Sequence, residues 1–295
     1  MNIIINIIII IFILIITLYL FYKLLSWILI CSINNKIKAI DTFSKQNNIN
    51  TIDVPVFYIN LDKSIDRNNY LMNELNKYKV QNYKRISAID GSKIKNIKND
   101  TIDGITFINN YNIRKNEIGC TLSHIKAIYN IYNNNYNIAL IVEDDTSFIL
   151  SKLWKYKLSE LIKNIPSDWG IIQLWCNKIN LTEKKLYREH TFGDYGAVAY
   201  LINKKGASDI IKNTGFPNVK LGEKINGTLY PTNGVADLFI YELTKTYVVN
   251  ISLLIPFNDL NYPSTIQPTI HSVSTLITVK NILDYYINAN NIKNY

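Results

Sequence analysis

The sequence predicts an α/β domain with a largely parallel sheet, placed behind an N-terminal membrane-spanning helix. Three observations lead to this fold class. Residues 3–22 form an almost uninterrupted apolar run, strand-like and helix-like segments alternate from residue 54 onward, and the apolar run 138–142 ends in three acids. Strands alternating with helices are typical of parallel sheets, whose ligands bind beyond the carboxyl ends of the strands.

The N-terminal run IIINIIIIIFILIITLYLFY reaches the length of about 20 apolar residues that a bilayer-spanning helix needs. Tyr19, Tyr22 and Trp27 suit a membrane interface. A cleaved signal peptide is the rival, but neither a basic first region nor a small-residue cleavage site is evident. A buried core helix is a further alternative, which the length disfavours. The predicted parts of the chain are a transmembrane signal anchor at residues 1–30, a polar stem at 31–53 and a globular domain at 54–295.

Two features of the chain disagree about the side of the membrane on which the globular domain lies. Lys23, Lys36 and Lys38 all follow the apolar run, and the positive-inside rule would keep the domain in the cytosol. The chain also holds four N-glycosylation sequons, which suit a lumenal domain. They lie at Asn99, Asn180, Asn226 and Asn250. We predict a single-pass protein with a lumenal domain of the endoplasmic reticulum or Golgi type.

Three strands with two helices between them are predicted from residue 54 to 142. VPVFYIN and YKRISAID are rich in β-branched and aromatic residues, as strands are, and Gly91 supplies the turn that closes the second. Between them, Ser64 and Asp66 cap a helix whose apolar side chains recur on one face. A longer helix over residues 116–132 precedes the strand IALIV.

The alternation continues after the acids. SKLWKYKLSELIKNI has helical spacing and stops at Pro166. GIIQLWC and AVAYLIN are predicted strands, and the second leads into the helix KKGASDIIKNT. VADLFIYELTK is the last predicted helix, and TYVVNISLLIP is a late strand pair or an extended segment.

Composition excludes some function classes. The net charge of +9 is carried by scattered lysines, and no basic stripe of the kind that binds nucleic acid is present. A basic surface still attracts anionic substrates or lipid headgroups. The three cysteines form no CxxC pair, so the sequence predicts neither a zinc site nor a redox motif.

Glu143, Asp144 and Asp145 follow the strand IALIV directly. Alternate side chains of an extended chain share a face, so Glu143 and Asp145 are expected on one side and Asp144 on the other. Two carboxylates about 4 Å apart repel by about 4 kcal/mol at an effective dielectric near 20. Protonation of one acid, a hard divalent cation or a solvated turn would each offset this repulsion.

Short blocks elsewhere in the chain favour the cation. VFYINLDKSIDR, RISAIDG, NEIGCTLSH and ALIVEDD occur in this order, followed by DWGIIQLWC, GAVAYLINKKGASDII and ADLFIYEL. Together they resemble glycosyltransferase family 25, the lipooligosaccharide and procollagen galactosyltransferase family, over roughly residues 54–271. The resemblance implies a nucleotide-sugar-dependent transferase with a GT-A (Rossmann-like) glycosyltransferase domain. It also implies that Glu143, Asp144 and Asp145 play the DxD role, holding Mn²⁺ or Mg²⁺ on the diphosphate of a UDP-sugar.

The same resemblance supplies candidate binding residues near the strand ends. The candidates for nucleotide-sugar binding are Asn60, Asp66, Arg67, Asp90, Glu117, Ser123, His124 and Asp144. Asp66 is as well suited to cap its helix as to bind, and Asp90 can accept from a ribose hydroxyl. His124 could be an ordinary structural histidine, but its match to the family block favours binding, and Cys120 of the same block is expected in the core.

Asp237 is the candidate catalytic residue. In this family an acid in the ADLFIYEL block faces the reaction centre, and apolar neighbours suggest a partly buried segment with a shifted pKa. An ordinary acid on the exposed side of a helix is the alternative. His271 is a further candidate metal ligand, without a matching block to support it.

The predicted function is transfer of a hexose, galactose or glucose, from a UDP-sugar to a hydroxyl of a glycan or a collagen-like protein, by a membrane-anchored enzyme. One rival is a binding module of this fold that has lost turnover. The other is a metal-dependent phosphotransferase or hydrolase, for which the sequence offers neither a nucleophile nor a second metal cluster.

Overall fold

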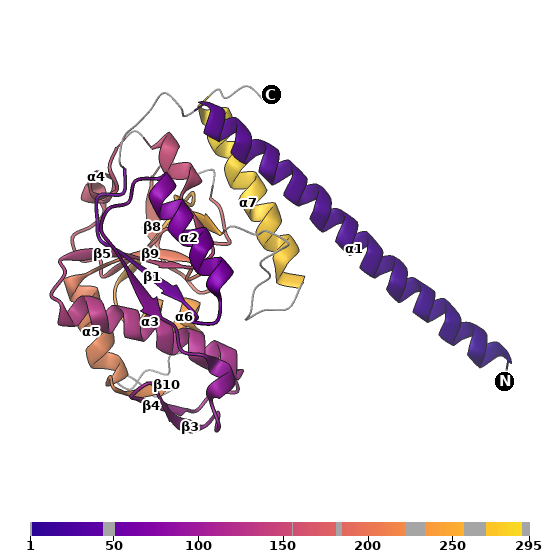
Figure 1. Ribbon diagram of the computed structural model, residues 1–295, viewed down its shortest axis with the longest axis horizontal. Coiled ribbons are helices and arrows are strands. Elements are labelled where there is room, and N and C mark those ends of the chain that lie inside the picture. Colours follow the sequence, from indigo (N-terminus) through magenta and orange to yellow (C-terminus); the bar gives the residue numbers. More distant parts are fainter. Residues whose placement is uncertain are drawn as a thin grey trace. The chain divides into compact units, whose positions relative to one another are not determined.

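The computed structural model describes residues 2–43, 51–154, 156–180, 185–221, 234–256 and 270–290 (Figure 1). Contacts divide the chain into two units. One comprises Met1–Phe43 with Asn258–Tyr295, and the other comprises Ser44–Phe257.

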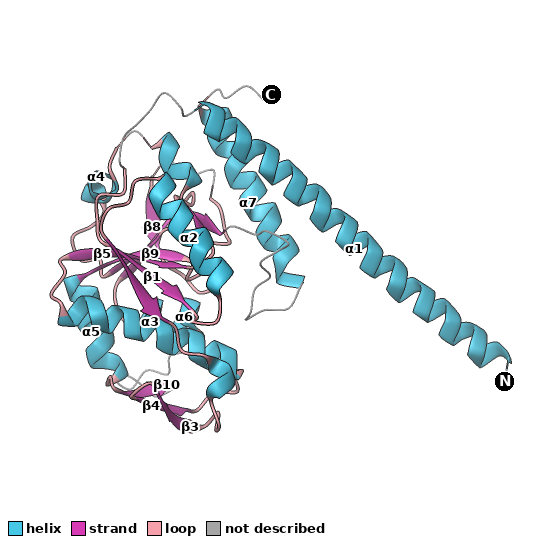
Figure 2. Cartoon of the chain, viewed as in Figure 1, coloured by secondary structure: helices cyan, strands magenta, loops and turns pink. Residues whose placement is uncertain are grey.

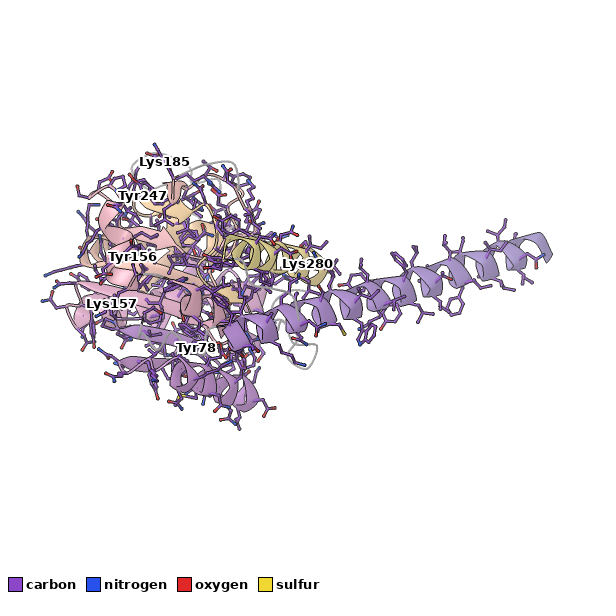
Figure 3. All side chains as sticks on the ribbon, turned by 90° about the horizontal axis from the view of Figure 1, so that it is seen from above. Tyr78, Tyr156, Lys157, Lys185, Tyr247 and Lys280 are labelled. Atoms are coloured by element: carbon purple, nitrogen blue, oxygen red, sulfur yellow. The ribbon has the colours of Figure 1, made fainter. Side chains whose placement is uncertain are left out.

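The first unit contains helix α1 (Asn2–Phe43) and helix α7 (Ile270–Ala289), which pack against each other. Side chains on all sides of α1 are exposed over residues 4–21 (Figure 3). The helix is long and apolar enough to cross a membrane, with a mean hydropathy of 3.1 in its most apolar window, properties that a signal sequence shares. Beyond residue 25 its apolar residues begin to be buried, and Lys36 pairs with Asp284 of α7.

The predicted boundary between anchor and stem falls inside α1, since the helix continues through residues 31–43. Residues 270–290, which the sequence assigned to the globular domain, group with α1 instead. The division into anchor, stem and globular domain stays a prediction, but the stem begins as a helix.

The second unit has the predicted α/β fold, built on a mixed seven-stranded sheet (Figure 2). In spatial order the strands are β2 (Tyr83–Ser87), β1 (Val56–Asn60), β5 (Ile138–Glu143), β9 (Ala199–Asn203), β7 (Ile171–Gln173), β11 (Thr246–Val249) and β8 (Tyr187–Glu189). Strands β2, β1 and β5 run parallel, as do β7 and β11, whereas β9 is antiparallel to both of its neighbours and β8 to β11.

The expectation of a largely parallel sheet is therefore wrong for its second half. Parallel neighbours need a crossover, usually a helix, whereas antiparallel neighbours do not. The described residues between β7 and β9 contain no helix, and the chain returns beside β7 in the opposite direction. Strands β1 and β2, by contrast, are joined through helix α2 (Ile65–Lys77) and pair in parallel.

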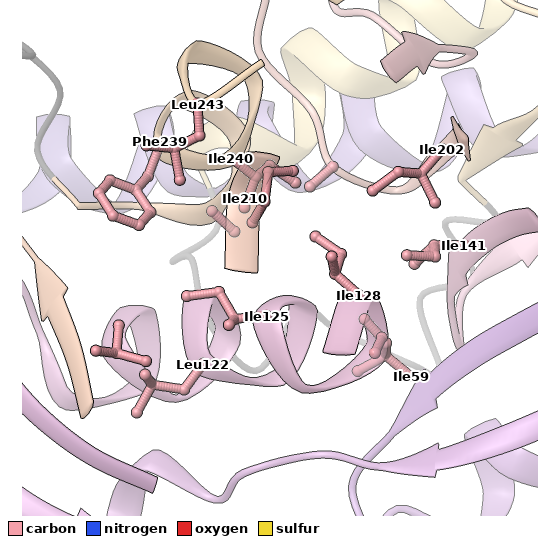
Figure 4. Packing of buried hydrophobic residues seen from close by; sticks show 14 of the residues in the cluster. Ile59, Leu122, Ile125, Ile128, Ile141, Ile202, Ile210, Phe239, Ile240 and Leu243 are labelled. Atoms are coloured by element: carbon pink, nitrogen blue, oxygen red, sulfur yellow. The ribbon is translucent and has the colours of Figure 1, made fainter. Parts of the chain in front are cut away.

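Helix α3 (Lys115–Asn133) lies at the centre of the main hydrophobic core. It contacts β1, β2, α5 (Lys204–Thr214) and α6 (Ala236–Glu242). Figure 4 shows its Leu122, Ile125 and Ile128 facing apolar side chains of the sheet and of α5 and α6. Their helical spacing, visible in the sequence, is what buries this face of α3.

A close backbone contact fixes the start of α3. A Cβ atom at Gly119 would lie 2.7 Å from the carbonyl oxygen of Ile89 and 2.8 Å from the nitrogen of Gly91. One at Gly91 would lie 2.2 Å from the carbonyl oxygen of Lys115. The expected turn is present as the 3₁₀ turn Gly91–Lys93, but Gly91 has no positive φ angle, so its lack of a side chain serves this close approach.

Several elements differ from the expected ones. Residues 151–165 are not one helix but a 3₁₀ turn (Ile149–Leu153), the short helix α4 (Leu158–Leu161) and a second 3₁₀ turn (Ile162–Asn164). The amide of Leu158 donates to the carbonyl of Thr51, and Asp53 accepts from the amide of Ser159. These contacts with a distant segment begin a new helix where the sequence predicts a continuous one.

Two small sheets were not predicted. The elements are β3 (Asn99–Ile102), β4 (Ile105–Asn109) and β10 (Asn218–Leu221) in one sheet, and β6 (Thr146–Ser147) and β12 (Ile255–Pro256) in the other. Strand β6 follows the acids directly, so the chain turns sharply between β5 and β6.

Candidate functional site

The carboxyl ends of the neighbouring strands β1 and β5 bring polar side chains together. Strand β5 ends at Glu143, and Asp144 and Asp145 form the turn into β6. At the end of β1, the buried side chain of Asn60 donates from Nδ2 to Oδ2 of Asp144, 2.7 Å away. Its Oδ1 accepts from Nη2 of Arg85 on β2 at 2.7 Å. Asn60 therefore joins the acids to the edge of the parallel half of the sheet.

Arg67, from the first turns of α2, pairs with both aspartates. Its Nη2 lies 2.5 Å from Oδ1 of Asp144 and 2.9 Å from Oδ2 of Asp145. The expectation that these two acids point to opposite sides is wrong, because strand alternation ends with β5 at Glu143 and both aspartates belong to a turn. The guanidinium of Arg67 thus offsets the repulsion between the two carboxylates. The sequence had suggested protonation, a divalent cation or a solvated turn for this purpose, and not an arginine.

The pair of aspartates is held in a poorly solvated place. Burial raises the pKa of Asp145 to about 7; Arg67 acts against this rise, and the charges of Glu143 and Asp144 add to it. Burial likewise raises the pKa of Asp144. Oδ1 of Asp145 is buried without a hydrogen-bond partner. An unsatisfied carboxylate oxygen beside a second carboxylate is a donor set that Mn²⁺ or Mg²⁺ takes, so these residues fit a divalent cation.

Glu143 faces a different group. Its Oε1 lies 3.2 Å from Nε2 of His124, a fully buried residue of α3. The other ring nitrogen, Nδ1, lies 3.1 Å from the hydroxyl of Tyr200 on β9. Burial raises the pKa of Glu143, but the hydrogen bond and charge of His124 outweigh this, so its pKa lies below the usual value. Cys120, one turn before His124 on α3, completes this cluster.

Asp237 lies in the first turn of α6, and its Oδ2 accepts from the amide of Gly196 at 3.2 Å. Burial and the nearby charge of Glu143 raise its pKa to about 6. The hydroxyl of Tyr241 donates to the carbonyl of Gly196 at 2.9 Å, which ties α6 to the same loop. Asp237 is thus a partly buried acid close to Glu143 of the triplet and not an exposed helix acid.

Ser123, Glu117 and Asp66 make local contacts or lie apart from the acids. The buried hydroxyl of Ser123 accepts from the amide of Ile89 at 2.8 Å and donates to the carbonyl of Gly119. Glu117 accepts from the amide and the side chain of Arg114 at the start of α3. Asp66 is exposed in the first turn of α2. Ligand roles for these three residues stay predictions.

Asp90 belongs to a polar rim above β1 and β2. It accepts from the side chain of Lys63 at 2.7 Å, which together with the hydrogen bonds of Ser92 lowers its pKa to about 2 despite the opposing effect of burial. Nearby, Asp62 accepts from Arg85 at 2.8 Å and from Ser87 at 2.9 Å. The side chain of His271 lies outside the described residues.

Sequence reasoning missed Arg85, Asp62, Lys63 and Tyr200. Arg85 and Ser87 alternate along a strand and so share a face, a signal that was available once β2 was placed. Tyr200 offered no comparable signal, because its hydroxyl reaches His124 only through the antiparallel pairing of β9 with β5.

The family described as Glycosyltransferase family 25 (LPS biosynthesis protein) matches residues 53–221. Among curated relatives, Procollagen galactosyltransferase 1 of Danio rerio is 26% identical over 173 residues, which cover 53% of this chain and 28% of the relative. Procollagen galactosyltransferase 2 of Homo sapiens is 24% identical over 199 residues, covering 62% of this chain and 31% of the relative. The chain thus matches less than a third of the length of these relatives.

Among solved structures, the one titled Crystal Structure of A197 from STIV aligns with a TM-score of 0.36 and 10% identity. The alignment covers 70% of this chain and 86% of that structure.

Proposed function

The chain belongs to glycosyltransferase family 25, and we propose that it transfers a hexose, galactose or glucose, from a UDP-sugar to a hydroxyl of a glycan or a collagen-like protein. The observation that carries the proposal is the aspartate pair at the carboxyl end of β5, in which Asp144 is buried and one oxygen of the partly buried Asp145 is left unsatisfied. The collagen-like acceptor is suggested by the names of the curated relatives, which are procollagen galactosyltransferases.

Donor binding is assigned to the edge formed by β1, β2 and β5. Asp144 and Asp145, with Glu143 as the third acid of the predicted triplet, would hold Mn²⁺ or Mg²⁺, which neutralises the charge that develops on a departing diphosphate. Arg67 is already placed against both aspartates and is a second source of positive charge for the phosphates. Asn60 orients Asp144, and Asp90 lies on the rim for contact with the ribose.

Asp237 is the proposed base. Direct displacement at the anomeric carbon requires removal of the proton from the acceptor hydroxyl. A carboxylate with a pKa of about 6 is mostly ionised at neutral pH, yet is basic enough to accept that proton. The amide of Gly196 holds one oxygen and thereby orients the other. The aspartate pair is less suited to this task because it already faces Arg67.

We further propose that α1 is an uncleaved anchor and that the enzyme works on the lumenal side of a membrane. The exposed apolar surface of residues 4–21 supports insertion into a bilayer. Membrane-anchored transferases of this kind meet their acceptors in the secretory pathway.

The decisive assay uses the full chain in detergent with a panel of UDP-sugars, collagen peptides and glycan acceptors, and it detects products by mass spectrometry. A hexosylated product is expected with Mn²⁺ or Mg²⁺, no product in excess EDTA, and loss of activity in Asp144→Ala and Asp145→Ala. Asp103→Ala is the matched control, because this partly exposed acid pairs only with Lys126 among the ion pairs of the described residues. Full turnover in EDTA would contradict the metal role. Binding of UDP-sugars without transfer or hydrolysis would favour the binding module instead.

A further inference from the structure

Glu143, the third acid of the predicted triplet, forms a cluster with Cys120 and His124, two residues that the proposed donor site does not use. Cys120 and His124 are four residues apart on α3, so their side chains share one face of the helix. Glu143, at the end of β5, meets this face. One ligand atom from each residue lies within 4.8 Å of the other two. The triplet of acids is therefore divided: Glu143 turns toward α3, whereas both aspartates turn toward Arg67.

His124 is oriented as a metal-binding histidine is. Its ring is fully buried, and the Tyr200 hydroxyl lies 3.1 Å from Nδ1. A hydrogen bond at one ring nitrogen sets the tautomer and directs the other nitrogen toward a metal. That other nitrogen, Nε2, is 3.2 Å from Oε1 of Glu143. A metal ion placed between them would replace the proton that the two atoms now share.

The charge around the thiol also favours a cation. Three acids, Glu143, Asp237 and Asp145, act on Cys120 electrostatically, so negative charge gathers where the ion would bind. A divalent ion offsets this charge, and a thiol that coordinates it loses its proton.

The donor set selects the kind of ion. A thiolate, an imidazole and a carboxylate are the ligands of Zn²⁺, whereas Mn²⁺ and Mg²⁺ prefer oxygen alone. Zn²⁺ binds these atoms at about 2.0–2.3 Å. Atoms already within 4.8 Å of one another therefore need only small side-chain rotations to share one ion.

We propose that Cys120, His124 and Glu143 bind a divalent transition-metal ion of the zinc class, at a site separate from the aspartate pair. Three protein ligands leave one position of a tetrahedral ion open to water. In this arrangement Glu143 binds the zinc-class ion together with the two residues of α3. Asp144 and Asp145 remain as ligands for Mn²⁺ or Mg²⁺, which prefer oxygen. It also revises the expectation that this chain has no zinc site, which came from the lack of a CxxC pair. It does not depend on the transferase activity.

The test is a Co²⁺ titration of the metal-free full chain in detergent, followed by absorption. We expect one ion per chain and the near-ultraviolet band of cobalt bound to a thiolate. Cys120→Ser should abolish the band, and Tyr200→Phe should lower the affinity about 10-fold or more by releasing Nδ1. Cys176→Ser, which removes a buried cysteine near Asp194, should keep the band. Asp145→Asn should also keep it while weakening Mn²⁺ binding, which separates this site from the donor site.

A second measurement covers the case in which Cys120→Ser does not fold. Zn²⁺ should slow alkylation of Cys120 in the unmodified sequence at least 10-fold, as mapped by mass spectrometry, and leave Cys31 and Cys176 unchanged. A thiolate band that persists in folded Cys120→Ser, or equal alkylation of Cys120 with and without Zn²⁺, would overturn the proposal. Failure of every transferase assay would leave it intact.

Discussion

Replacing Arg67 by leucine tests how the buried acids are tolerated. The guanidinium contacts Asp144 at 2.5 Å and Asp145 at 2.9 Å, and the three side chains are at most 21% exposed. Leucine keeps apolar bulk but removes the charge. Two carboxylates then face each other without a positive partner among their present contacts, in a place where water enters poorly.

The magnitude follows from the burial and the pKa values. Removing one partner of a buried ion pair costs about 3–5 kcal/mol, because the other charge is left uncompensated. The pKa of Asp145 is already about 7, so this acid can take up a proton when Arg67 is lost. That proton limits the expected loss to about 3 kcal/mol. For a domain of this size the loss lowers Tm by about 6–12 °C.

Thermal unfolding of the full chain in detergent, followed by near-ultraviolet circular dichroism in EDTA, measures the effect. Arg114→Leu is the matched control, because the Arg114 side chain is 53% exposed and pairs only with Glu117 among the described ion pairs. It should cost at most about 1 kcal/mol. Mn²⁺ at 100 times its Kd should restore about 2.7 kcal/mol to Arg67→Leu. A Tm within about 2 °C of the unmodified chain in EDTA would refute the reasoning.

Three further predictions concern catalysis, packing and topology. Asp237→Asn should keep UDP-sugar binding but lower kcat about 10²-fold or more, and kcat/KM of the unmodified enzyme should rise as pH increases through about 6, where Asp237 ionises. A nearly unchanged kcat or a product of retained configuration would exclude it as the base. Gly119→Ala should lower stability by about 1–3 kcal/mol in thermal unfolding, because its Cβ would lie 2.7 Å from the Ile89 carbonyl; an unaltered Tm would contradict this close contact. In eukaryotic cells, endoglycosidase should shift a lumenal chain through Asn99, which is exposed, and not through Asn250, which is buried and donates to a backbone carbonyl. No shift, with protease sensitivity in sealed microsomes, would place the domain in the cytosol.

Local patterns were sufficient for the elements that are regular along the chain. Strands β1 and β5 are apolar up to their last residues, Asn60 and Glu143, and α3 repeats its apolar residues at helical spacing, so the sequence pattern predicted all three. Strand β10 was missed because it pairs with residues 106–109 of β4, far away in the sequence. The hairpin of β3 and β4 is local, and its Asp103-Gly104 turn was a signal that the sequence offered. The reversal at β9 was missed because the sequence does not show which neighbour a strand will pair with.

The same division holds for the site. The sequence by itself determined that a buried strand ends in three acids and that an apolar helix precedes the globular part, because these features depend only on neighbouring residues. Only the tertiary structure decided that Asp144 and Asp145 meet Arg67 while Glu143 meets His124. Strand alternation ends at Glu143, and in the turn that follows a side chain points toward whichever partner lowers its free energy. Those partners come from α2 and α3, whose positions are set by the packing of the whole core.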